Sequence, residues 1–138
     1  MTETFVRVNY SEVDQMGVVY HARYLVWLDV ARCEHLRQQG MSYAELERRG
    51  LRLAVSELRV RYRRPARYDD LIRVRCWLRE SVPRRVRFGY ALELADREIL
   101  VATAEVALLA LGADFSLSRL PPDVLALLAV EPDPVRLF

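Results

Sequence analysis

The sequence predicts a single α+β domain over residues 1–138, an antiparallel five-stranded sheet wrapped around one long central helix. Three patterns predict it: an alternating strand near the start, helical spacing over residues 22–39, and four later strand patterns separated by turn residues. The length and the balance of 52% apolar to 29% charged residues suit one globular unit with its own core.

The first strand is predicted from Val6, Val8 and Tyr10, which alternate with polar residues and lead into the irregular stretch from Ser11 to Gly17. The helix expected over residues 22–39 carries apolar groups nearly all round, which is typical of a helix buried on more than one side. A strand therefore delivers the chain to a loop, and the loop to a buried helix.

A capping box at Ser42 to Glu45 predicts a short second helix that Gly50 ends. The next elements read as a four-stranded meander with one apolar and one arginine-rich face. The last of these strands is apolar on both faces, so it is central in the sheet or lies at a subunit contact. The predicted bounds of these four strands are residues 53–63, 71–80, 84–95 and 99–111. A short C-terminal helix is expected over residues 118–129, followed by a loosely ordered tail over residues 130–138.

The charge is uneven along the chain. Residues 51–87 carry 12 arginines and 4 acids (+8), whereas residues 88–138 carry 3 arginines and 8 acids (−5). The basic block raises the hypothesis of a nucleic-acid-binding module. Few aromatic residues interleave with these arginines, no known binding motif occurs and acidic segments flank the block, so no nucleic-acid partner is expected.

Other site classes are excluded by what the chain lacks. Cys33 and Cys76 form no C-x-x-C pair and are expected to be reduced and buried. His21 and His35 are the only histidines, so no metal centre is expected. Neither a targeting segment nor an apolar run long enough for a membrane span is visible, which predicts a cytoplasmic protein without membrane contact.

The most informative segment is the acidic loop before the long helix. Free N–H groups at a helix start carry partial positive charge and attract a developing oxyanion. Asp14, held close by a turn at Gly17, could attack a polarised carbonyl or activate water against it. From the residues alone, the simpler interpretation is that Asp14 and Gly17 make a turn and that His21 packs near the helix start.

The run from Asp14 to His21 has the form D-x-x-G-x-V-Y-H and resembles the signature of hot-dog-fold acyl-CoA thioesterases of the 4-hydroxybenzoyl-CoA thioesterase and YbgC type. The order of elements over residues 4–129 is similar as well, including Tyr62-x-x-Pro65 and the Tyr68-Asp69-Asp70 region. The resemblance implies hydrolysis of an acyl- or aryl-CoA thioester to a free acid and CoA. CoA would be part of this small-molecule substrate, and no cofactor is implied.

The resemblance also implies roles for individual residues. Asp14 would be the catalytic carboxylate, as nucleophile or general base, and Gly17 would allow the close approach. The backbone N–H of His21 would be the oxyanion donor, while its imidazole and Tyr24 would line the site. Val13 departs from the small polar residue often found before the aspartate. Tyr20 and Trp27 are expected at the acyl pocket.

The phosphates of CoA require cationic partners, and arginine binds phosphate in a bidentate manner. In the enzymes that this chain resembles, a basic run leading into a strand holds the nucleotide. Arg84, Arg85 and Arg87 match that run in position, and Arg119 is a further candidate. The alternative for the three arginines on the sheet is that they are solvated or paired with acids such as Glu57, Glu80 and Glu93.

Several alternatives stay open at this point. A non-catalytic acyl-CoA or acyl-carrier-protein binding module on the same fold would use the same residues without turnover. The acyl class, CoA against carrier-protein thioesters, and a nucleophilic against a general-base role for Asp14 are undecided. A sheet with an open edge and a two-faced apolar strand predicts a homodimer or homotetramer with sites shared between subunits.

Overall fold

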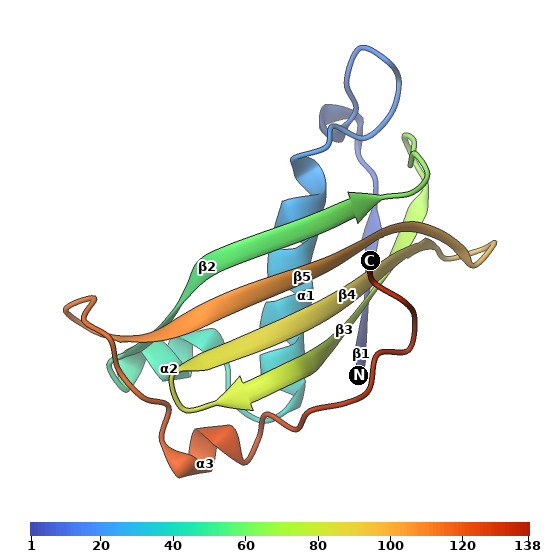
Figure 1. Ribbon diagram of the computed structural model, residues 1–138. Coiled ribbons are helices and arrows are strands. Elements are labelled where there is room, and N and C mark those ends of the chain that lie inside the picture. Colours follow the sequence, from blue (N-terminus) through green and yellow to red (C-terminus); the bar gives the residue numbers. More distant parts are fainter.

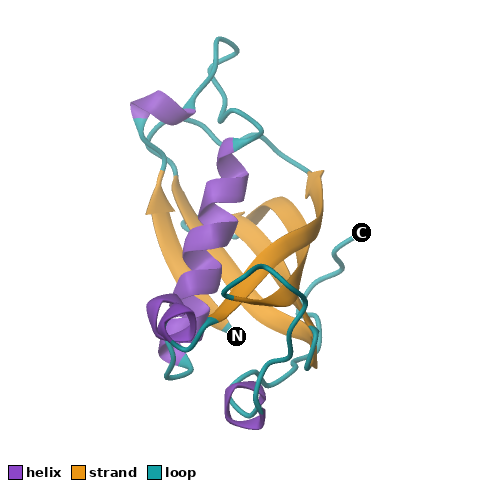
Figure 2. Ribbon diagram, turned by 90° about the vertical axis from the view of Figure 1, so that its left-hand side faces the viewer, coloured by secondary structure: helices purple, strands orange, loops and turns teal.

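The computed structural model describes residues 1–138 and contains a five-stranded antiparallel sheet curved around helix α1 (Figures 1 and 2). The predicted fold class is thereby confirmed. In chain order the elements are β1 (Thr2–Arg7), the 3-10 helix η1 (Tyr10–Glu12), α1 (Arg23–Gln38), α2 (Tyr43–Arg48), β2 (Leu51–Tyr62), β3 (Leu71–Val82), β4 (Arg85–Leu94), β5 (Ile99–Gly112) and α3 (Pro122–Leu125).

The strand order is β1-β3-β4-β5-β2, so the predicted four-stranded meander is correct only for β3, β4 and β5. β1 occupies the free edge of β3, with Val6 opposite Ile72, and β2 is therefore placed at the other edge, against β5. β5 lies between β4 and β2. On the outer face the tail covers part of it, where the Thr103 hydroxyl donates to the Leu137 carbonyl. Of the two interpretations of this strand, the central position is correct.

Two segments differ from their predicted extents. The first strand ends at Arg7 because Asn9 caps η1, where its side chain accepts a hydrogen bond from the Ser11 N–H at 3.0 Å. The C-terminal helix covers only four residues. Pro121 keeps the chain extended up to that point, and the Ser118 N–H donates to the Ala110 carbonyl, so the chain cannot be helical there.

The core fills the space between α1 and the inner face of the sheet. On α1, Trp27 is buried together with Leu28 and Ala31, whereas Val26 and Val30 stay 50% and 43% exposed. The helix is therefore buried on two sides and open on a third. Prominent core side chains are Tyr24, Leu28, Ala31, His35 and Leu36 of α1 with Val74, Cys76, Phe88, Tyr90, Leu92, Ala104 and Val106 of the sheet.

On the outer face of the sheet, arginines of the basic block form ion pairs with acids from later in the chain. Glu93 on β4 pairs with Arg73 and Arg75 on β3, and Glu105 and Asp133 pair with other arginines of β3 and β4. Acids from the last third of the chain thus neutralise arginines of the basic block. Such partly buried networks orient strands more than they add stability.

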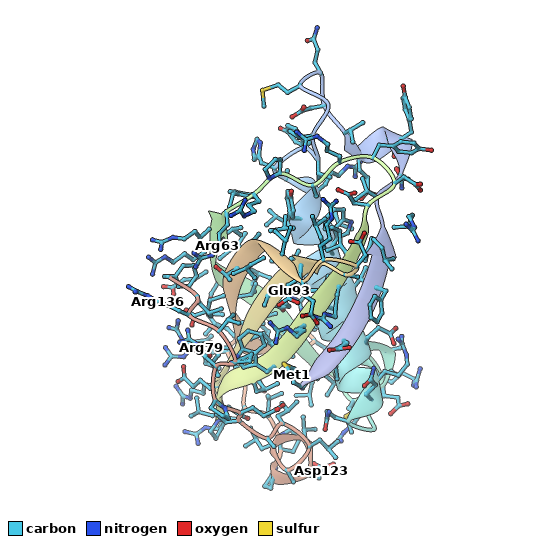
Figure 3. The ribbon with its side chains drawn as sticks, turned by 90° about the vertical axis from the view of Figure 1, so that its right-hand side faces the viewer. Met1, Arg63, Arg79, Glu93, Asp123 and Arg136 are labelled. Atoms are coloured by element: carbon cyan, nitrogen blue, oxygen red, sulfur yellow. The ribbon has the colours of Figure 1, made fainter.

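The C-terminal tail lies against this outer face, which differs from the loose order expected for it. The Trp77 indole N–H donates to the Asp133 carboxylate at 2.9 Å, and Leu137 is buried against Trp77 and Ala91. Arg63 donates to the Leu137 carbonyl at 3.1 Å. Figure 3 shows Arg63, Arg79 and Arg136 along the same side of the molecule as the tail. No helix is both long and apolar enough to cross a membrane.

Candidate active site

The loop between η1 and α1 forms a tight hairpin-like turn. Val13 and Val19 form an antiparallel bridge, and the Asp14 N–H donates to the Val18 carbonyl at 2.9 Å. The Gly17 N–H returns to the Asp14 carbonyl at 2.9 Å, and Gly17 has a φ of +76°, which only glycine adopts without strain. The predicted turn at Gly17 is therefore present, and it fixes the backbone on both sides of Asp14.

The Asp14 carboxylate is half-buried and only partly engaged. Its Oδ1 accepts a hydrogen bond from the Met16 N–H at 2.9 Å, an arrangement that orients the side chain within its own turn. No other protein group hydrogen-bonds to this carboxylate. One oxygen thus remains free to act on a substrate or a water.

A buried carboxylate ties the loop to the helix. Glu12 is 8% exposed, and its Oε2 accepts a hydrogen bond from the Trp27 indole N–H at 2.8 Å. Its Oε1 accepts from the Asn9 N–H at 3.0 Å, and its backbone carbonyl accepts from the Tyr20 N–H at 2.9 Å. Every oxygen of Glu12 therefore holds a different part of the loop or helix, which restricts where Asp14 can lie relative to α1.

The start of α1 has no side-chain cap. The N-cap position is Ala22, and no side chain accepts a hydrogen bond from the first turn. The backbone N–H groups of His21, Ala22 and Tyr24 make no hydrogen bond with any protein group. Unpaired donors at a helix start, together with the helix dipole, favour a negatively charged oxygen.

A cavity of about 340 Å³ brings these parts together. Asp14, His21 and Tyr24, three of the residues predicted to be catalytic, line it, and Gly17 lies in the adjoining turn. Burial raises the pKa of Tyr24, so its hydroxyl stays protonated near neutral pH. The other lining residues are Met16, Val18, Val19, Tyr62, Arg63, Arg64 and Pro65.

Of the two residues predicted at the acyl pocket, Tyr20 lines a hollow in the structure and Trp27 does not. Tyr20 is 46% exposed and lines a neighbouring hollow that also contains Asp14. Trp27 is only 2% exposed, belongs to the core and donates to Glu12, so it supports the loop rather than lining either hollow. A helical tryptophan beside the site is explained here by the hydrogen bond of its indole.

Sequence reasoning missed the wall formed by the end of β2. Tyr62, Arg64 and Pro65 line the cavity opposite the Asp14 loop, and the Tyr62 hydroxyl donates to the His21 carbonyl at 2.7 Å. The spacing Tyr62-x-x-Pro65 was the available signal. It could not be assigned to the site from the residues alone, since 41 positions separate Tyr62 from His21.

The arginines predicted to bind CoA phosphates lie at the opposite end of the sheet from Asp14. The Asp14 loop contacts Ala66, just before β3 begins, through the Val19 N–H at 2.8 Å. Arg84 lies in the turn where β3 has ended. The Leu120 N–H donates to the Pro83 carbonyl at 2.7 Å, so Arg119 is at the same corner as Arg84.

Two of these four arginines are engaged within the chain. Arg85 and Arg87 donate to the Glu80 carboxylate at 2.7 and 2.9 Å, and the hydrogen bond from Arg85 is the main reason that the pKa of Glu80 lies below its usual value. Arg84 and Arg119 are exposed and make no ion pair. No group of three or more histidine, cysteine, aspartate or glutamate side chains is arranged to hold a metal ion.

Comparison with known proteins bears on this site. The model of the thioesterase-like superfamily matches residues 8–128. The chain is 36% identical over 108 residues to the acyl-CoA thioesterase YbgC of Haemophilus influenzae, which covers 78% of this chain and 79% of the relative. It is 34% identical over 85 residues to YneP of Bacillus subtilis, and this match spans 62% of each protein.

A solved structure is similar along nearly its whole length. The crystal structure of a hypothetical protein from Thermus thermophilus superposes with a TM-score of 0.88 at 34% identity. The match covers 93% of this chain and 97% of that one. The curved sheet, the central helix and the loop between them are thus shared as one architecture.

Proposed function

Because this chain belongs to the thioesterase-like superfamily of hot-dog-fold proteins, we propose that it hydrolyses the thioester of an acyl- or aryl-CoA to a free acid and CoA. The family recognised from the sequence is confirmed, and the names of two relatives support thioester hydrolysis as the activity. The observation that carries the specific proposal is the cavity in which the free oxygen of Asp14 and the uncapped start of α1 meet.

In the proposed reaction, the thioester carbonyl lies between Asp14 and the first turn of α1. As a general base, Asp14 takes a proton from water and the resulting hydroxide attacks the carbonyl carbon. The carbon–sulfur bond then breaks, and protonated Asp14 gives its proton to the leaving thiolate, which restores the carboxylate. As a nucleophile, Asp14 forms an acyl anhydride, expels the thiolate, and water then hydrolyses the anhydride. Both routes place negative charge on the carbonyl oxygen.

The unpaired N–H groups of His21 and Ala22 are the proposed donors to that oxyanion. They need no rearrangement during the reaction because the helix holds them in place, and preorganised donors of this kind contribute strongly to catalysis. Tyr24 and the His21 imidazole line the same cavity and would position water or the acyl group. Arg64, which forms no ion pair, makes the cavity attractive to an anionic substrate.

The acyl group is proposed to extend past Tyr20 along α1. The hollow that holds Tyr20 and Asp14 shares Val26 with an apolar groove of about 280 Å³ between α1 and β2. The groove therefore adjoins the hollow at Val26, and we propose that it receives the aliphatic or aromatic part of the acyl group. Its lining residues are Leu25, Val26, Leu28, Asp29, Arg32, Val55, Leu58 and Val106.

The test measures thiol release from aromatic, short-chain and long-chain acyl-CoA esters and from an acyl-carrier-protein thioester. Wild type is expected to turn over at least one class, and Asp14→Asn is expected to lose about 100-fold or more of kcat, since general-base catalysis contributes at least that much. Asp96→Asn, an exposed aspartate in the β4–β5 turn, is the matched control and should keep full activity.

Two results would contradict the proposal. Folded wild-type protein that binds CoA esters but releases no thiol from any of them would make this chain a binding module. Equal activity of wild type and Asp14→Asn would remove Asp14 from the reaction and leave the superfamily assignment standing.

A further inference from the structure

Tyr62 makes a contact that the proposed chemistry leaves unexplained. It is the last residue of β2, and its hydroxyl donates to the His21 carbonyl oxygen at 2.7 Å, across 41 positions of sequence. The bond joins the edge of the sheet to His21, two residues before α1 begins. It lies in the wall of the cavity that contains Asp14.

The His21 carbonyl depends on this bond. In a regular helix it would accept a hydrogen bond from the residue four positions on, but the Leu25 N–H donates to Ala22 instead, at 3.2 Å. No other backbone N–H donates to the His21 carbonyl. The Arg23 N–H donates to the Tyr20 carbonyl at 2.9 Å and closes a turn around this peptide, but Tyr62 is the only group that hydrogen-bonds to the His21 carbonyl itself.

That peptide carries the N–H of Ala22, one of the two proposed oxyanion donors. The His21 carbonyl and the Ala22 N–H belong to the same peptide unit, so the orientation of one fixes the orientation of the other. A carbonyl that accepts a hydrogen bond also makes the N–H of its peptide a stronger donor, because the peptide is polarised. The bond from Tyr62 acts on geometry and on donor strength together.

The tyrosine ring is itself held in place. It packs edge-to-face on Tyr24, with ring centroids 5.3 Å apart, and Tyr24 packs in the same way on Trp27 at 5.1 Å. Trp27 in turn donates to Glu12, which anchors the loop that carries Asp14. One chain of contacts thus links the Tyr62 hydroxyl to both halves of the site.

We propose that Tyr62 is a positioning residue for thioester hydrolysis: its hydroxyl fixes and polarises the peptide between His21 and Ala22 so that the Ala22 N–H donates to the oxyanion. The role rests on the proposed function, since it concerns how that oxyanion is held. The positioning role predicts that removal of the Tyr62 hydroxyl slows the chemical step and does not change the affinity for a substrate analogue that lacks the thioester carbonyl.

The test compares Tyr62→Phe with Tyr43→Phe. Tyr43 is a matched control because its hydroxyl also donates to a backbone carbonyl, that of Leu53 at 2.9 Å, away from the cavity. Tyr62→Phe keeps the ring and is expected to lower kcat about tenfold, the value of one hydrogen bond, at unchanged KM. Tyr43→Phe should leave kcat unchanged, and both variants should bind a CoA thioether without a carbonyl as wild type does.

A second measurement separates this proposal from the proposed function. The amide signal of Ala22 in an NMR spectrum should shift in Tyr62→Phe and stay in place in Tyr43→Phe, whether or not the protein turns over thioesters. An unshifted Ala22 amide, an unchanged kcat in Tyr62→Phe, or a loss confined to KM would overturn the positioning role. If the Ala22 amide shifts in Tyr62→Phe but the wild-type protein has no thioesterase activity, the result supports the geometry and overturns only the proposed function.

Discussion

At the scale of single residues, buried polar groups fix the loop between η1 and α1 that carries Asp14. Only N–H donors hydrogen-bond to Glu12: its carboxylate accepts from Asn9 and Trp27, and its backbone carbonyl accepts from Tyr20. A carboxylate suits this setting because it can only accept hydrogen bonds. Asp14 differs, because a single N–H from Met16 orients it and the rest of its capacity is unused. The first carboxylate is structural and the second is free for chemistry.

His35 belongs to the same scale and predicts a pH dependence of stability. Its Nδ1 is 3.0 Å from the Thr2 hydroxyl, and burial is the main reason that its pKa lies below the ordinary value of 6.5, with a smaller contribution from the nearby amino terminus opposed by Glu131. As the pH falls through 6.5, the unfolded chain binds a proton before the folded one. The free energy of unfolding therefore decreases from about pH 6.5 down to the folded pKa and is constant below it.

Urea denaturation at about pH 7.5 and about pH 5.5 measures this effect, since the two conditions bracket the ordinary histidine pKa. Wild type should be less stable at the lower pH, and His35→Gln should show a smaller decrease. His21→Gln, at the exposed histidine, is the control and should decrease as wild type does. An equal decrease in wild type and His35→Gln would contradict the assignment to His35.

At the scale of elements, the turn between β3 and β4 joins the segment before α3 at one corner. The Leu120 N–H bonds to Pro83, which brings Arg119 beside Arg84, while Arg85 and Arg87 are held by Glu80. A 12-residue strand such as β3 spans about 40 Å, so this corner is far from Asp14 of the same chain. If it binds the phosphates of CoA, the substrate must lie between two copies.

The two arginines of this corner that form no ion pair, Arg84 and Arg119, are the ones expected to contribute to CoA binding. Arg84→Ala and Arg119→Ala should raise KM for CoA esters with little change in kcat. Added salt should raise the KM of the wild-type enzyme toward that of the variants, because screened phosphate contacts lose affinity. Arg97→Ala, in the exposed β4–β5 turn, is the control. Steady-state kinetics at low and high salt provide the measurement, and unchanged KM in both variants would exclude this corner as the phosphate site.

At the scale of the whole molecule, β2 is an open edge beside an exposed side of α1. Val55 and Leu58 on β2 are 53% and 43% exposed, and Val26 and Val30 on α1 are similarly open. An unpaired edge with apolar neighbours is a site for pairing with another chain. Antiparallel pairing of two β2 strands would bring the β3–β4 corner of one copy toward the Asp14 end of the other, which would complete a shared site.

Light scattering with size-exclusion chromatography should therefore give at least twice the chain mass of 16.1 kDa. Leu58→Glu on β2 should shift the protein toward monomer, because a charge at the pairing edge is unfavourable. Since Leu58 also lines the proposed acyl groove, the monomer fraction and not the activity of this variant is the test. Phe5→Glu, at the exposed opposite edge on β1, is the matched control and should keep both assembly and activity. A wild-type monomer, or dissociation by Phe5→Glu alone, would refute pairing through β2.

The sequence by itself determined what depends on neighbours in the chain. Alternating and helical patterns placed the five strands and α1, and the turn at Gly17 positioned Asp14 before the helix start, since these features require only local backbone preferences and a hydrophobic period. The run from Asp14 to His21 was enough to identify the superfamily. The assignment of catalytic roles within it stays a prediction.

Only the tertiary structure decided what depends on partners distant in sequence. The edge taken by β2, the burial of Trp27 under Glu12, and the contact of Tyr62 with His21 all follow from strand order and register. An arginine on a strand has the same local pattern whether it meets an acid or solvent, so the sequence could not decide that Arg85 pairs with Glu80 while Arg84 stays unpaired. Local propensity decides which elements form, and packing decides which side chains meet.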